Sequence, residues 1–171
     1  AEGHRFQTDT DTEVLAHLIE KHMQRGFKLE QAVGAALRAV EGTYGIAVVC
    51  ADEPGVLVGA RNGSPLVVGV ADGEYFLASD VAPIVEHTRQ VVYLDDGEMA
   101  VMTSEGFHTA TIEHERVNKE VHEVEWDLGK IEKGGFAHFM LKEIHEQPEA
   151  VRNSMRGRVL PDEGLARLGG L

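Results

Sequence analysis

The single cysteine, Cys50, is the only side chain in this sequence that could act as a thiolate nucleophile. It ends the apolar run Ile46-Ala47-Val48-Val49-Cys50 and is followed by Asp52 and Glu53. A reactive thiolate needs a nearby cation or a helix N-terminus, and two acidic neighbours supply the opposite charge. We therefore expect Cys50 to be a buried structural residue. A lone cysteine also excludes an internal disulfide and a zinc site built from cysteines alone.

Nine histidines raise the question of a metal site. None stands in a His-Glu-x-x-His pattern, and the closely spaced pairs are His17 with His22 and His138 with His145. These pairs lack thiol or carboxylate partners at the spacing typical of a zinc site. We therefore expect packing or surface histidines, and we predict no metal and no cofactor.

Asp11 is the carboxylate with the clearest potential for binding. It lies in Thr8-Asp9-Thr10-Asp11-Thr12-Glu13, directly before a segment of helical periodicity. A carboxylate at a helix start can point away from the framework and bind a ligand ammonium group. A capping role for this polar segment is the other interpretation.

The loop Gly59-Ala60-Arg61-Asn62-Gly63-Ser64-Pro65 contains glycines but does not match a phosphate-binding loop, because it lacks the lysine and leads into a strand. We expect a turn in which Arg61 has a structural role. The sequence contains no Gly-x-Ser-x-Gly motif, so no serine triad is predicted.

Two helices are expected to position Asp11, over residues 11–25 and 29–40. Thr10 and Glu13 have the spacing of a capping box at the first helix start, and Gly26 ends that helix. The following residues have the periodicity of strands, and turns rich in Gly, Asp and Pro separate these strands. The strands are expected at residues 46–50, 56–60, 66–70, 75–78, 91–94, 100–103 and 108–112. A short helix capped by Ser79 or Asp80 is expected to run to about Thr88.

The C-terminal part is predicted to change character after Glu113, where a charged stretch without clear period runs to Glu132 as an extended surface segment. A helix from Phe136 to His145 is expected to stop before Pro148, because proline cannot continue a helix. A last helix is expected from Glu149 to Met155. Two helices followed by a meander of antiparallel strands give an α+β fold class.

Composition limits the function classes. The 171 residues include 43% hydrophobic and 26% charged residues, as in globular proteins. Sixteen Lys and Arg against 29 Asp and Glu give a net charge of −13, which disfavours nucleic-acid binding. No apolar run reaches the roughly 20 residues of a membrane helix, and no signal peptide is recognisable. We expect a cytoplasmic protein.

Four stretches together resemble the glucosamine-6-phosphate synthases, a family of class II glutamine amidotransferases that use fructose 6-phosphate as the acceptor. The stretches are Gly3 to Leu18 with its core Thr10-Asp11-Thr12-Glu13-Val14-Leu15-Ala16-His17-Leu18, Gly42-Thr43-Tyr44-Gly45, Ala60-Arg61-Asn62-Gly63-Ser64-Pro65-Leu66-Val67-Val68-Gly69 with Phe76-Leu77-Ala78-Ser79-Asp80, and Phe139-Met140-Leu141-Lys142-Glu143-Ile144-His145-Glu146-Gln147-Pro148. They occur in the family's order and cover nearly the whole chain up to Arg158. The last stretch distinguishes this family from other class II amidotransferases.

The resemblance implies part of the four-layer αββα sandwich of N-terminal-nucleophile hydrolases, with a helical connector at the C-terminus. It places the glutaminase domain at residues 1–133, and the connector and start of a sugar-isomerase domain at residues 134–171. In the family an N-terminal cysteine attacks the glutamine carboxamide with its own α-amino group as base. Ammonia then passes to the isomerase domain, which makes glucosamine 6-phosphate. Asp11 falls where the family's aspartate binds the α-amino group of glutamine.

Residue 1 is Ala, and the family's nucleophile and oxyanion motif find no match in the sequence. We therefore expect a fragment whose catalytic residues lie elsewhere, inactive by itself, with the missing glutaminase half and the isomerase domain as partners and a homodimeric parent. Two alternatives remain at this stage, a non-catalytic glutaminase-like binding module and another class II amidotransferase.

Overall fold

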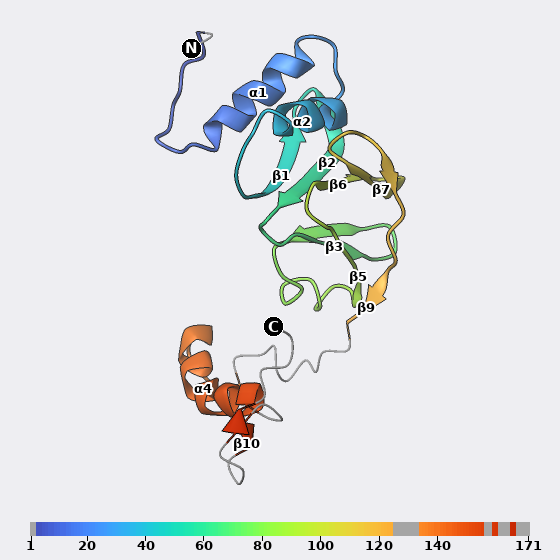
Figure 1. The fold of residues 1–171 in the computed structure, drawn as a ribbon. Coiled ribbons are helices and arrows are strands. Elements are labelled where there is room, and N and C mark those ends of the chain that lie inside the picture. The colour runs from blue at the N-terminus through green and yellow to red at the C-terminus, as the bar shows by residue number, and fades with distance from the viewer. Residues whose placement is uncertain (1–2, 125–133, 156–158, 161–164, 167–171) are drawn as a thin grey trace. The chain divides into compact units, whose positions relative to one another are not determined.

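The computed structural model describes residues 3–124, 134–155, 159–160 and 165–166. The chain forms two units, residues 1–125 and residues 126–171 (Figure 1). The expected boundary between residues 133 and 134 adjoins segment 125–133, which lies outside the described residues. The first unit contains the segments expected to carry the glutamine site.

Two helices open the first unit, α1 (Glu13–Met23) and α2 (Leu29–Leu37). Gly26, at φ +91°, ends α1 as predicted. Its N–H donates to the Met23 carbonyl at 2.8 Å, and the Phe27 N–H donates to the His22 carbonyl at 3.3 Å. This pair of backbone hydrogen bonds is typical of a helix that ends at a glycine. The first N–H of α2, from Leu29, donates to Glu53 Oε1 at 2.6 Å, so a carboxylate lies at the positive end of that helix.

The predicted capping box at Thr10 is wrong. The N-cap residue of α1 is Thr12, without a side-chain capping bond, and the Thr10 hydroxyl accepts the Thr12 N–H only at 3.4 Å. Glu13 does reach back, but past Thr10: its carboxylate accepts the N–H groups of Gln7 and Thr8, each at 2.7 Å. The segment before α1 is thereby fastened to the helix by its first residue.

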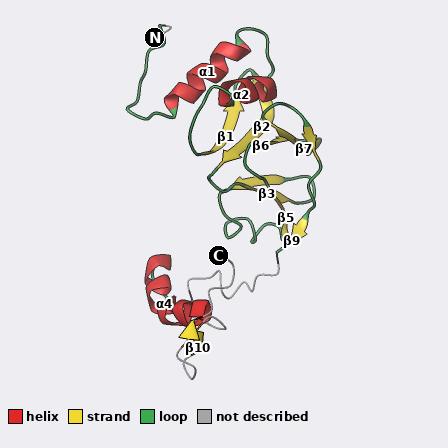
Figure 2. Ribbon diagram, in the orientation of Figure 1, coloured by secondary structure: helices red, strands yellow, loops and turns green. Residues whose placement is uncertain are grey.

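The strands of the first unit form two antiparallel sheets (Figure 2). The seven predicted strands are confirmed to within a few residues. One sheet has the order β1-β2-β6-β7-β8 and the other has the order β4-β3-β5-β9. The bounds are β1 Tyr44–Cys50, β2 Glu53–Asn62, β3 Val67–Val70, β4 Tyr75–Ala78, β5 Gln90–Tyr93, β6 Glu98–Thr103, β7 Gly106–Thr111, β8 Arg116–Val117 and β9 His122–Glu123.

Side-chain alternation along β2 and β6 separates two hydrophobic cores. Val58 and Ala60 of β2, with Val101 of β6, are buried against α1 and α2. The intervening residues Ala100 and Met102 are buried in the core shared with the second sheet, as expected when neighbouring side chains leave opposite faces of a strand. The layers are therefore a helix pair, the five-stranded sheet and the four-stranded sheet, which confirms the expected partial αββα sandwich with three of its four layers in the described residues.

The expected short helix over residues 79–88 is wrong. The segment forms successive turns, in which Ile84 and Val85 N–H groups donate to the Val81 carbonyl and Asp80 Oδ1 accepts the Ala82 N–H at 2.8 Å. Pro83 disfavours helical geometry at Ala82, the residue before it, which favours separate turns over a continuous helix. Val81, Ile84 and Val85 are nevertheless buried, and Val81 and Ile84 pack against the outer face of the second sheet.

The charged stretch after Glu113 supplies the short strands β8 and β9, and Val124 is buried at its end. The interpretation as a purely extended surface segment is therefore incomplete, because part of it extends both sheets. Its residues from 125 to 132, Trp126 among them, lie outside the described residues.

The second unit contains α4 (Phe139–Met155) and a small hairpin of β10 (Val159–Leu160) with β11 (Leu165–Ala166). The expected helix break before Pro148 is wrong, because α4 continues through that residue. Proline removes the hydrogen bond to the Ile144 carbonyl, but the Ile144 residue is 52% exposed, so water can satisfy this group. In the described part of the chain, no helix combines the length and apolar composition needed to cross a membrane.

Candidate functional site

Asp11 lies in the first turn leading into α1. Its carbonyl accepts the Val14 N–H at 3.1 Å, which fixes the backbone at this position. Its exposed carboxylate accepts the Thr12 hydroxyl at 3.5 Å, a long contact that leaves most of the acceptor capacity free. The structure thus holds the Asp11 backbone while its carboxylate stays open to a ligand.

Asp11 lines a cleft of about 520 Å³ where segments far apart in the sequence meet. The start of α1, the residues before and within β1, and the turn after β2 all contribute. The lining residues are Asp11, Thr12, Val14, Leu15, Val40, Glu41, Thr43, Tyr44, Gly45, Ile46 and Ser64. The carboxylates of Asp11 and Glu41 therefore converge with hydroxyl groups and apolar side chains, a combination that suits a small zwitterion with a polar side chain.

The turn at one side of the cleft is fixed by Asp96. Its Oδ1 accepts the Gly63 N–H at 2.8 Å and hydrogen bonds from Arg61 Nε and Nη2 at 3.1 and 2.7 Å. Arg61 Nη1 also donates to the Leu94 carbonyl at 3.0 Å. The Gly63 N–H, followed by Arg61, lowers the pKa of Asp96. The expected structural role of Arg61 is confirmed, and it helps to place Ser64 at the cleft.

The opposite side of the same turn is anchored to the segment before β1. Asn62 Nδ2 donates to the Gly42 carbonyl at 2.7 Å, and Tyr44 forms an isolated bridge with Gly63. Burial, with the negative charges of Glu113 and Asp96, raises the pKa of Tyr44. Tyr44 is therefore a neutral phenol in the cleft at physiological pH, able to donate or accept a hydrogen bond.

Cys50 does not belong to this cleft. It is half-buried and unpaired at the far end of β1 from Tyr44, roughly 20 Å away along an extended strand. There it lines a separate groove of about 680 Å³ between α1 and the strands. Its partly buried side chain packs against the helix-facing core, which agrees with the structural role expected for it.

The histidines considered for metal binding do not come together as pairs. His22 stacks on Phe27, with ring centroids 5.7 Å apart, and in the second unit His145 stacks on Phe136 at 5.2 Å. His17 instead contacts His4 and Phe6 in the segment before α1. The expectation that His17 has no carboxylate partner is wrong, since Glu13 and Glu20 lie 3.4 and 3.7 Å from its ring nitrogens.

Glu13, directly before the helical turn that carries His17, is held as a carboxylate. The Thr8 hydroxyl and then the Gln7 N–H lower the pKa of Glu13 to about 2. This group links residues 7 and 8 to α1 and so helps to set the course of the chain toward Asp11.

The family model of the glutamine amidotransferase domain matches residues 1–86, which include every residue lining the Asp11 cleft. The chain belongs to the glutamine amidotransferase family. The match runs from the segment before α1 to the turns after β4.

Curated relatives of this glutamine amidotransferase are named isomerizing glutamine–fructose-6-phosphate aminotransferases. The chain is 58% identical to the aminotransferase from Chlorobaculum tepidum over 99% of the residues of the chain. Identity is 54% over 91% of the chain for the protein from Methanothermobacter thermautotrophicus and 48% over 99% for a protein from Thermus thermophilus. The chain spans only 26 to 28% of the length of these three relatives.

Solved structures agree with the layered fold. The glutamine phosphoribosylpyrophosphate amidotransferase from B. subtilis, complexed with ADP and GMP, matches 65% of the chain and 24% of its own length with a TM-score of 0.54 and 28% identity. The structure of the allosteric regulatory enzyme of purine biosynthesis matches with a TM-score of 0.53 and 28% identity, over 65% of the chain and 24% of its own length. The sandwich of the N-terminal-nucleophile amidotransferases is thereby confirmed.

Sequence reasoning singled out Asp11 but missed its cleft neighbours as site residues. Thr43, Tyr44 and Ser64 belong to motifs that carried the family resemblance, so the signal was present as a shared pattern. Their proximity to Asp11 arises from the antiparallel pairing of β1 with β2, in which Tyr44 lies opposite Asn62. His4 lies in the first family-like stretch but outside its core, and its contact with His17 appears only in the structure.

Proposed function

We propose that this chain forms the glutamine-binding part of the glutaminase domain of an isomerizing glutamine–fructose-6-phosphate aminotransferase, and that Asp11 binds the α-ammonium group of glutamine. The complete enzyme would use glutamine and fructose 6-phosphate to make glucosamine 6-phosphate. The observation that carries the proposal is the open Asp11 carboxylate in a cleft of about 520 Å³ built from the segments typical of the family.

The chemistry of the cleft suits this ligand. A carboxylate and an ammonium group form a charge-assisted hydrogen bond, which is stronger than a neutral one. The hydroxyl groups of Thr43, Tyr44 and Ser64 can bind the remaining polar atoms of an amino acid. These residues bind and orient the substrate, whereas the covalent step belongs to a cysteine that this chain does not provide at the cleft.

Three curated relatives support fructose 6-phosphate as the acceptor, in preference to phosphoribosylpyrophosphate. Identity to the aminotransferases reaches 58% over 99% of the chain, including the described helix α4. Identity to the phosphoribosylpyrophosphate amidotransferase is 28% over 65%. We further propose a cytoplasmic location, in keeping with a single unpaired cysteine, and assembly with the rest of the glutaminase domain, a sugar-isomerase domain and a second copy of the enzyme.

Asp11→Asn in the complete enzyme tests the proposal. The amide keeps the size of the side chain but loses the charge, so we expect the KM for glutamine to rise about tenfold or more while the KM for fructose 6-phosphate stays unchanged. Asp9→Asn is the matched control, because Asp9 is an exposed carboxylate two residues away that does not line the cleft. An unchanged glutamine KM in Asp11→Asn, or an equal rise in Asp9→Asn, would contradict the role of Asp11.

A further inference from the structure

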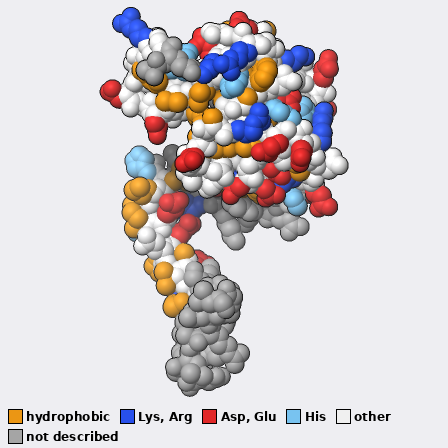
Figure 3. Space-filling view, turned by 45° about the horizontal axis from the view of Figure 1, so that its top comes forward, with side chains coloured by type: hydrophobic (Ala, Val, Ile, Leu, Met, Phe, Trp, Pro, Cys, Tyr) orange, Lys and Arg blue, Asp and Glu red, His pale blue; other side chains and the backbone are white. Residues whose placement is uncertain are grey.

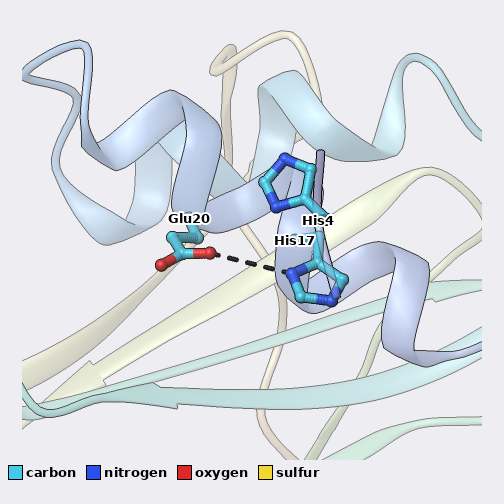
Figure 4. Close-up of side chains that lie close together, drawn as sticks. All are labelled: His4, His17 and Glu20. Carbon is cyan, nitrogen blue, oxygen red and sulfur yellow. Dashed lines mark ion pairs between the residues drawn. The ribbon is translucent and has the colours of Figure 1, made fainter. Parts of the chain in front are cut away.

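Three potential metal ligands gather on the side of α1 that faces the preceding segment. His4, His17 and Glu20 each offer one donor atom, and these atoms all lie within 4.8 Å of one another. Figure 4 shows the Glu20 carboxylate and the His17 ring directed toward each other, with the His4 ring beside them. Among the described residues this is the group of His, Cys and acidic side chains with a spacing that suits a metal ion.

The fold supplies the ligands from two elements. His17 and Glu20 are three residues apart on α1 and therefore share a face of the helix. His4 arrives from the segment before α1, where its ring centroid lies 4.6 Å from that of His17. Phe6 packs edge-on against the same ring at 4.9 Å. The position of His4 is thus supported by its own contact with His17 and by the contact of Phe6, two residues farther along the segment.

The two nitrogens of His17 have different surroundings. Nδ1 lies 3.7 Å from Glu20 Oε2, on the side of the cluster. Nε2 is buried without a hydrogen bond among the described residues and lies 3.4 Å from Glu13 Oε1. A histidine that binds a metal through one nitrogen commonly presents the other to a carboxylate, which fixes the ring orientation. Glu13 occupies that outer position.

We propose that His4, His17 Nδ1 and Glu20 bind a Zn²⁺ ion, with Glu13 orienting the His17 ring. Two imidazoles and one carboxylate are a ligand set that zinc uses, leaving one position for water. Tetrahedral zinc needs donor atoms roughly 3.4 Å apart, given bonds of about 2.0 to 2.1 Å. Rotation of the half-exposed His4 and the exposed Glu20 side chains can bring the donors to that spacing.

The proposed zinc site is accessible to solvent, and a bound ion would affect the structure near the start of α1. His17 and Glu20 also line the groove of about 680 Å³ beside α1, which gives an ion and its bound water a path from solvent. A bound ion would link the segment from residue 4 onward to the middle of α1, the helix that begins beside Asp11. Hard cations such as Mg²⁺ prefer oxygen ligands and are not expected to bind here.

Zinc titration of the chain, prepared without a polyhistidine tag, tests the site. In competition with a chromophoric chelator, we expect one Zn²⁺ per chain to bind at this site, and binding at least about tenfold weaker in His4→Gln and Glu20→Gln. His22→Gln is the matched control, since His22 lies on the same helix outside the cluster. Zinc should also raise the Tm of the wild type and of His22→Gln but not of His4→Gln.

Three results would overturn the site: no zinc binding by the wild type, equal affinity in all variants, or a loss in His22→Gln that matches the loss in His4→Gln. Because His4 and Glu20 are substituted separately and neither is fully buried, the test does not depend on a His17 variant that could destabilise α1. Mg²⁺ at the same concentration provides the control for unspecific binding to an acidic protein, whose acidic side chains are spread over the face drawn in Figure 3.

Discussion

The backbone N–H of Gly63 donates to Asp96 Oδ1 at 2.8 Å, which ties the turn after β2 to the loop before β6. Arg61 binds the same oxygen through Nη2 at 2.7 Å. One exposed carboxylate therefore fixes both the charged side chain and the backbone of the turn that brings Ser64 to the Asp11 cleft.

Asp96→Asn is expected to lower the Tm at neutral pH, because the amide gives up the charge-assisted bonds to Gly63 and Arg61. The lowered pKa of Asp96 means that its contribution is complete above the unfolded value, 3.8, and is lost as the pH falls below it. The free energy of unfolding of the wild type should then fall more steeply than that of Asp96→Asn as the pH drops from about 5 to about 3.

Urea unfolding at several pH values measures this difference. Asp72→Asn, in the exposed turn between β3 and β4, is the matched control and should keep the wild-type pH dependence. Parallel pH profiles for the wild type and Asp96→Asn would contradict a structural role for the Asp96 carboxylate.

Glu13 is expected to titrate near pH 2 in the folded chain, because the Thr8 hydroxyl and the Gln7 N–H stabilise its ionised form. Stability that depends on Glu13 is complete above its ordinary pKa of 4.5 and is lost as the pH falls from there toward 2. Thr8→Ala should move the pKa of Glu13 upward, as observed by NMR of the side-chain carboxyl carbon. Thr12→Ala removes a hydroxyl that bonds Asp11 instead, and it should leave the Glu13 titration unchanged.

Gly34→Ala in α2 sets two effects of opposite sign against each other. Alanine favours a helix interior over glycine by roughly 0.5 to 1 kcal/mol. A Cβ at this position would lie 2.7 Å from the Ile112 carbonyl oxygen and 2.8 Å from the His114 ring. Because backbone cannot rotate away, we expect the clash to win and the variant to lose about 1 to 3 kcal/mol in the free energy of unfolding. A gain in stability would show that α2 does not approach this loop so closely.

The strand positions could be predicted from the turn residues between them, whereas contacts between residues far apart in the sequence could not. Gly and Asp clusters separate the strands along the chain, so β1 to β7 lie near their expected positions. The segment 79–88 has apolar residues at helical spacing but forms turns, and the bias that Pro83 imposes on Ala82 is not visible in the apolar spacing. α4 continues through Pro148 because exposure of the chain offers water as a substitute partner, which periodicity does not report.

The Asp11 cleft and the histidine cluster could likewise be predicted only in part from the sequence. Asp11 was recognisable from its position before a helix and from a family pattern, but its contact surface depends on the pairing of β1 with β2. His4 and His17 are joined by an irregular segment held by Glu13, and no periodic rule relates two such positions. Side chains that meet through sheet topology or irregular backbone thus have to be found in three dimensions.

Cys50→Ala should leave glutamine turnover by the complete enzyme essentially unchanged. Cys50 lies at the opposite end of β1 from the Asp11 cleft and packs its side chain against the helix-facing core. For the same reason the isolated chain is expected to release no glutamate from glutamine, with or without the substitution. Glutamate release that Cys50→Ala abolishes would identify Cys50 as a nucleophile, and release that survives it would point to a different catalytic group in this chain.

Val49→Lys should reduce self-association of the isolated chain. β1 is at the edge of its sheet in the described part of the protein, and Val49 is 74% exposed on it. An apolar edge strand offers free N–H and carbonyl groups to another chain, and an edge lysine opposes such pairing. The comparison is light scattering over a range of concentrations, with Val151→Lys on α4 as the control because that valine is 54% exposed but not on a strand. Equal association of the two variants would mean that the β1 edge does not drive the contact, whereas a selective loss in Val49→Lys would place the contact at this strand.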